Sequence, residues 1–118
     1  MRVLCLSANE ELASLRSAVL SVHGVQVDIA RSRKEATELL EENGYAAAVL
    51  CHSISEKTAD HVVALFRERN PGRCVIFVAR APYQESPVKA EISICAIDGP
   101  ESLVDVVLSC KPGPSVAN

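Results

Sequence analysis

The sequence contains very few aromatic residues. Phe, Tyr and Trp make up 3% of its 118 residues, whereas hydrophobic residues as a whole make up 48%. The core must therefore be built from Val, Leu, Ile and Ala, the residues that dominate buried parallel strands. A chain of this length fits one domain that buries roughly two-thirds of its unfolded surface. The composition indicates a single α/β domain.

The sequence also lacks a basic cluster and a long apolar run. Its 12 Lys and Arg are scattered and outnumbered by 15 Asp and Glu, for a net charge of -3. Nucleic-acid binding needs a concentrated basic face. No apolar stretch approaches the length of a membrane span, and the N-terminal MRVLCLSANEE reaches acidic residues too early for a secretory signal. We expect a cytoplasmic protein with neither nucleic acid nor a membrane as partner.

The five cysteines form no C-x-x-C pair, and no histidine lies at a metal-ligand spacing from them. Cys5, Cys74 and Cys95 lie inside apolar runs, where a cysteine is usually a small buried hydrophobe. We therefore expect reduced thiols, with no disulfide framework and no structural metal.

Five short apolar runs recur along the chain, each bounded by Gly, Pro, Asn or Ser. They span residues 2–7, 25–30, 45–51, 73–79 and 92–97. Their length and composition predict buried strands. The segments between them carry apolar residues at helical spacing, with Asn9 as an N-cap, Gly24 as a stop, and Ser32 with Glu35 as a capping box.

Strands that alternate with helices fold by right-handed crossovers into a parallel sheet with helices on both faces. The connection at residues 80–91 is the exception, because Pro82 and Pro87 make any helix there short or irregular. A last helix begins at Pro100. We assign residues 1–110 to the domain and residues 111–118 to a flexible tail.

Ligands of such a sheet bind beyond the carboxyl ends of its strands. The residues expected there are Ser7, Ala8, Cys51, Ala79 and Ala96. No glycine-rich loop follows the first strand, and two acidic residues come where a helix N-terminus would otherwise take an anion. We predict that the chain binds no nucleotide and needs no cofactor.

Several segments resemble response-regulator receiver domains, over residues 2 to about 110. The phrase GYAAAVLC stands where receivers have Gly-Tyr-Asp-Leu-Val-Leu-Leu-Asp, and CVIFVA and PESLVDVV resemble their fourth strand and last helix. The resemblance implies a flavodoxin-like, doubly wound sheet of five parallel strands in the order 2-1-3-4-5.

The polar residues of that family are absent from the matching positions. Ser7 and Ala8 replace the acidic pair that holds Mg²⁺, Cys51 replaces the phosphoacceptor Asp, and Ala79 replaces the Thr or Ser. The Lys is replaced by Ala96, or by Gly99 if Pro100 is taken as the family proline. Phosphoryl transfer needs an oxygen nucleophile, a divalent cation and donors to the transferring oxygens. The resemblance therefore implies a pseudo-receiver that is not phosphorylated and binds no Mg²⁺ at this site.

The function that follows is a stand-alone receiver-like module of bacterial signal transduction, which is not an enzyme and acts by protein–protein interaction. Its partner or homodimer surface is expected on residues 80–91, the strand 92–97 and the last helix. The residues predicted to form this surface are Tyr83, Glu85, Leu103 and Val107.

Three hypotheses for the role of Cys51 stay open. The first is a packed side chain without chemistry, the second is a redox sensor, and the third is the nucleophile of a small cytosolic thiol enzyme. Reactivity requires a lowered pKa, for which the following helix N-terminus, Lys57 and Arg80 are candidate sources. A phosphocysteine mechanism is disfavoured because CHSISEKT has no glycine to bring backbone N–H groups together around a phosphate.

Overall fold

The computed structural model describes residues 1–118 except 52, 82–84, 87, 96–98 and 111–118. The predicted tail therefore lies outside the described residues. The elements follow one another as β1 (Arg2–Leu6), α1 (Glu10–Val22), β2 (Gln26–Ala30), α2 (Arg33–Glu42), β3 (Ala47–Cys51), α3 (Glu56–Arg69), β4 (Cys74–Ala79), β5 (Ile92–Cys95) and α4 (Pro100–Ser109).

The five strands form one parallel sheet in the order β2-β1-β3-β4-β5, which confirms the predicted fold. β3 lies at the centre and is buried along its whole length. Its run of small and branched residues suits a strand that is covered on both faces. β5 forms one edge of the sheet and is only half-buried.

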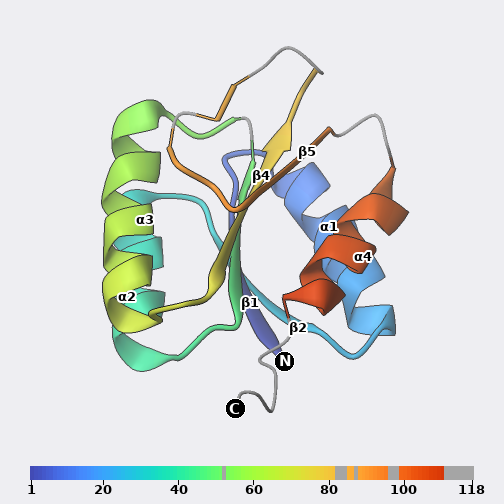
Figure 1. The fold of residues 1–118 in the computed structure, drawn as a ribbon, viewed down its shortest axis with the longest axis horizontal. Coiled ribbons are helices and arrows are strands. Elements are labelled where there is room, and N and C mark those ends of the chain that lie inside the picture. The colour runs from blue at the N-terminus through green and yellow to red at the C-terminus, as the bar shows by residue number, and fades with distance from the viewer. Residues whose placement is uncertain (52, 82–84, 87, 96–98, 111–118) are drawn as a thin grey trace.

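Helices cover both faces of the sheet, with α2 and α3 on one side and α1 and α4 on the other (Figure 1). Side chains alternate along each strand, so that Leu4 and Leu6 pack with α2 and α3, whereas Val3 packs with α1 and α4. Two apolar layers therefore share one sheet.

The predicted helix signals are present where the sequence placed them. Asn9 caps α1 by accepting from the backbone N–H of Leu12, and Ser32 caps α2 by accepting from that of Glu35. Gly24, just beyond α1, has a φ of 81°, a left-handed conformation that favours glycine. These contacts are local, which is why a short stretch of sequence was sufficient to predict them.

The connection between β4 and β5 contains no helix in its described residues, consistent with the prediction of a short or irregular one. Val88 and Ala90 pack on the layer of α2 and α3 instead. Glu91 holds the end of this connection. Its carboxylate accepts from Arg67 at 2.8 Å and from the backbone N–H of Val75 at 2.6 Å.

Among the described residues, no helix has the length and apolar character needed to cross a membrane.

Candidate functional site

The carboxyl ends of β1, β3 and β4 meet at one edge of the sheet, as predicted. Leu6 of β1 pairs with Leu50 of β3, and Cys51 of β3 pairs with Val78 of β4. Ser7, Cys51 and Ala79 therefore lie at or just beyond the ends of three neighbouring strands. Ala96, the fifth residue expected here, lies outside the described residues.

Cys51 points to the face of the sheet that α1 covers. It shares a small buried cluster with Cys5 of β1 and Ala13 of α1, and its exposed fraction is 2%. Arg16 extends from α1 to this cluster, where its Nη1 donates to the Cys51 Sγ at 2.8 Å. The carboxyl end of β3 is therefore occupied by a buried thiol in contact with a guanidinium.

The two thiols of this cluster have opposite pKa shifts. A hydrogen bond from Cys5 lowers the pKa of Cys51 to about 6, with help from the charge of Arg16 and from Ser7, against the raising effect of burial. The same hydrogen bond, together with burial, raises the pKa of Cys5. The pair therefore holds one proton on Cys5 and stabilises a thiolate at Cys51.

The hydroxyl groups at this edge are engaged in local hydrogen bonds. The fully buried Ser7 accepts from the backbone N–H of Asn9 at 3.1 Å and donates to the Asn9 carbonyl at 3.2 Å. The backbone N–H of Ala8 donates to the Ser53 Oγ at 3.1 Å, which links the β1–α1 loop to the β3–α3 loop. These groups brace the two loops against each other.

The donor set of the described residues at this edge does not fit Mg²⁺. That cation prefers carboxylate and other hard oxygen ligands in an octahedral arrangement. Cys51 offers a soft sulfur beside a cationic guanidinium, and Glu10, the nearest acidic residue along the chain after Ser7, forms an ion pair with Arg31 at 2.6 Å. The described residues include no group of three or more His, Cys, Asp and Glu that could hold a metal.

Arg16 is the residue of this site that the sequence analysis missed. Lys57 and Arg80 were named as sources of a lowered Cys51 pKa, whereas the structure attributes it first to Cys5 and then to Arg16. The position of Arg16 within the helical pattern could have identified it. Arg16 lies four residues after Leu12 and three before Val19, so it falls on the inward stripe of its helix, where a charged residue is unusual.

The predicted partner surface needs a correction. Leu103 and Val107 have exposed fractions of 3% and 0% and belong to the core beneath α4, so they are not available to a partner. Their helical spacing with Val104 places them on the face that packs against the sheet. Glu85 is exposed, and Tyr83 lies outside the described residues.

No family model matches the sequence, and no curated protein matches it. Solved structures do match the fold. The receiver domain of the Francisella response regulator 1452 has a TM-score of 0.76 and 18% identity, covering 92% of this chain and 94% of its own. A CheY-like receiver domain from Methanospirillum hungatei JF-1 has a TM-score of 0.77 and 18% identity, covering 92% and 90%.

An orphan response regulator of H. pylori also matches, with a TM-score of 0.74 and 19% identity, over 95% of this chain and 97% of its own. At such identities the likeness concerns the fold. The chain folds as a receiver domain does, with a five-stranded parallel sheet in the order 2-1-3-4-5.

Proposed function

We propose that this chain is a receiver-like module of bacterial signal transduction that is not phosphorylated, has no catalytic activity and acts through protein contacts. Support comes from its likeness to receiver domains over nine-tenths of its length. Further support comes from the loss of the carboxylates on which receiver chemistry depends.

The contact between Arg16 and Cys51 is the observation that carries the proposal. Phosphoryl transfer to a receiver needs a carboxylate oxygen and a bound cation. Here a thiol that is 2% exposed stands at the matching position, and the guanidinium 2.8 Å away supplies a positive charge where Mg²⁺ would have to bind. Like charges repel, so the guanidinium opposes binding of the metal.

A direct test adds Mg²⁺ and beryllofluoride, a mimic of the phosphoryl group, to the isotope-labelled protein and follows its amide resonances. We expect no saturable shift near Ser7 or Cys51. Intact mass after incubation with acetyl phosphate should also stay constant. A conventional receiver treated in parallel controls for the reagents.

A saturable shift around Cys51, or a gain in mass equal to one phosphoryl group, would show that the proposal is wrong.

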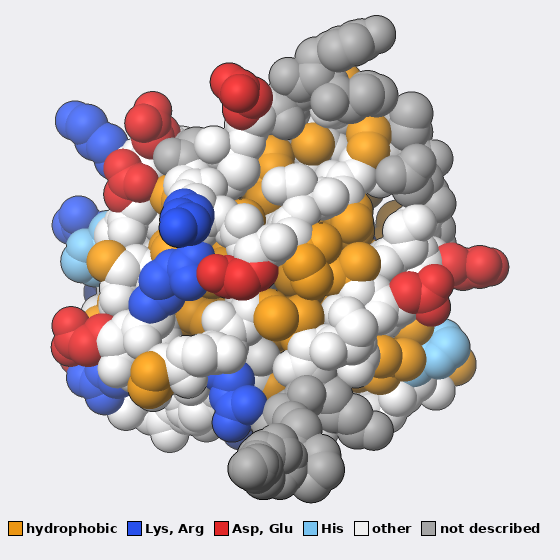
Figure 2. Space-filling view, viewed as in Figure 1, with side chains coloured by type: hydrophobic (Ala, Val, Ile, Leu, Met, Phe, Trp, Pro, Cys, Tyr) orange, Lys and Arg blue, Asp and Glu red, His pale blue; other side chains and the backbone are white. Residues whose placement is uncertain are grey.

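The partner surface that we propose lies on the face formed by the β4–β5 connection, β5 and α4. Hydrophobic side chains gather in the middle of this face, over the edge of the sheet, and acidic side chains flank them over α4 (Figure 2). Exposed residues of this face include Glu85, Lys89, Ser93, Glu101 and Asp105. An apolar centre with acidic side chains along α4 suits a partner that presents apolar groups and, opposite α4, basic groups.

The thiol hypotheses have weaker support. A lowered pKa favours reactivity at Cys51, but reagents must reach the sulfur, and the residue is buried against α1. We therefore assign Cys51 to the packing of the α1 face.

A further inference from the structure

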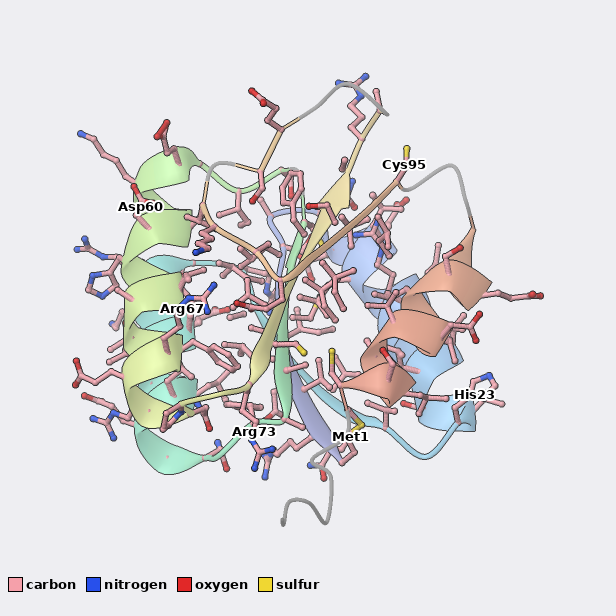
Figure 3. All side chains as sticks on the ribbon, viewed as in Figure 1. Met1, His23, Asp60, Arg67, Arg73 and Cys95 are labelled. Atoms are coloured by element: carbon pink, nitrogen blue, oxygen red, sulfur yellow. The ribbon has the colours of Figure 1, made fainter. Side chains whose placement is uncertain are left out.

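A cavity of about 310 Å³ lies between α1, α4 and the β4–β5 edge of the sheet. β5 and α4 contribute to both this cavity and the partner surface, but the partner surface consists of the exposed residues of these elements. Aliphatic side chains of four elements make up most of its wall, namely Leu12, Leu15, Val19, Val78, Ile94 and Leu103. In Figure 3 side chains on the sheet side of α1 and α4 lie beside β5.

Leu15 at this cavity is 63% exposed, which is unusual for a large aliphatic side chain beside other apolar residues. Its neighbours one helical turn away, Leu12 and Val19, line the same cavity. An apolar ligand would remove this surface from water and gain the corresponding hydrophobic free energy.

Arg16 is the only charged residue that lines the cavity, as far as the described residues show. A guanidinium has five N–H donors. Within the described part of the chain, the guanidinium of Arg16 donates to one acceptor, the Cys51 Sγ. A cation with unused donors in an apolar wall is a complement for an anion, and a carboxylate matches its fork geometry.

We propose that this cavity binds a small amphiphilic carboxylate, with the carboxylate on Arg16 and the apolar part against the aliphatic wall. Ligand pockets commonly measure roughly 300–1,000 Å³, so this one suits a small ligand. A nucleotide is disfavoured because its phosphates need several donors or cations, whereas this wall supplies a single arginine.

The bound carboxylate would share the guanidinium of Arg16 with Cys51. Occupancy of the cavity is thereby coupled to the end of β3, because Arg16 contacts both. This part of the inference rests on the proposed function: the ligand would act at the position where receivers are modified, and would thus serve as an input signal.

The test is an amide-resonance titration of the whole chain with hexanoate, with hexanol and acetate as comparison probes. We expect saturable shifts at Val78, Ile94 and Cys51 with hexanoate. Hexanol, which has the chain without the charge, should bind at least tenfold more weakly, and acetate, which has the charge without the chain, should not saturate.

Arg16→Gln removes the charge and should lower the affinity for hexanoate at least tenfold, while the affinity for hexanol stays unchanged. Arg16→Lys keeps the charge but loses the fork geometry, so its affinity for hexanoate should lie between those of the wild type and Arg16→Gln. Arg33→Gln, at an exposed arginine of α2, is the matched control and should bind as the wild type does. Resonance dispersion verifies that each variant is folded.

The proposal is overturned if hexanoate gives no saturable shift, if hexanol binds as tightly, or if a folded Arg16→Gln or Arg16→Lys variant retains full affinity. Saturable hexanoate binding together with a beryllofluoride response would refute the proposed function and leave the carboxylate site standing. The two ideas therefore fail separately.

Discussion

The hydrogen bond from Cys5 and the contact with Arg16 lower the pKa of the Cys51 thiol at the end of β3. The thiolate that Cys5 and Arg16 stabilise is buried, and its hydrogen bond to the guanidinium joins α1 to β3. A charge-assisted bond of this kind is stronger than a neutral one. The contact therefore contributes to stability only in the pH range where the thiolate exists.

The pH dependence of unfolding checks this point. Because the pKa of Cys51 falls from 9.0 to about 6 on folding, the native state binds fewer protons than the unfolded state between these values. The contribution of the Cys51 thiolate to the free energy of unfolding is complete above pH 9.0, declines as the pH falls and is lost below about pH 6. The free energy of unfolding should rise by up to about 1.4 kcal/mol per pH unit in this window.

Urea unfolding of the wild type and of Cys51→Ser at about pH 6 and about pH 8.5 measures the effect. The upper limit avoids alkaline conditions, where the raised pKa of Cys5 makes the native state retain a proton that the unfolded state loses. Cys51→Ser should flatten the slope, and Cys95→Ser, the same exchange in β5, should keep it. Equal slopes in the wild type and Cys51→Ser would contradict the assignment.

At the scale of elements, the β4–β5 connection is held by Glu91 in place of a regular helix. Burial raises the pKa of this carboxyl, but the hydrogen bonds from Arg67 and the Val75 N–H outweigh it and lower the pKa overall. Because both Arg67 and Glu91 are more than a third exposed, the ion pair itself is screened by solvent. The bond to the β4 backbone is therefore the more important one.

Glu91→Ala should reduce the free energy of unfolding by about 1–2 kcal/mol, because the Val75 N–H loses its acceptor. Glu91→Gln keeps an oxygen acceptor and should cost about half as much. Hydrogen exchange at the Val75 amide gives the local measurement, and it should accelerate in Glu91→Ala far more than in Glu91→Gln. Equal exchange in both variants would contradict the role of this bond.

The elements differ in how far the sequence predicts them. Asn9 and Ser32 were identified as caps because each bonds a residue three positions away. The buried strands followed from their apolar runs. Arg16 and Cys51, however, are 35 positions apart, and their contact depends on how α1 is rotated over the sheet. A short stretch of sequence carries no information on that rotation.

The errors at Leu103 and Val107 have a related cause. They were assigned to the partner face because they lie on the last helix, although the apolar spacing of Leu103, Val106 and Val107 also predicted that they face the core. The structure gives the exposed side to Glu101 and Asp105, four residues apart.

For the whole molecule, we expect self-association or partner binding through the face of β5 and α4. Asp105→Arg and Ser93→Arg place a positive charge on this face and should abolish association with a basic, apolar partner. Glu38→Arg adds the same charge on α2, on the other side of the sheet, and should have no effect.

Sedimentation of the wild type over a wide range of concentrations tests the homodimer, and affinity capture with the same three variants tests other partners. Loss of capture in the β5 and α4 variants alone would support the proposal for a basic partner, and reversible self-association of the wild type would support a homodimer. A wild type that stays monomeric and retains nothing from its host, or equal behaviour of Glu38→Arg, would contradict it.

The half-buried edge strand β5 also bears on how the protein behaves in concentrated solution. Its residues, Ile92–Cys95, include no charge and no proline, and among the described residues no further strand pairs with its outer side. Such an edge is a template for adding strands from other chains. Colloidal solubility then depends on the modest net charge of -3, so this protein should precipitate more readily as the pH approaches its isoelectric point near 5.6.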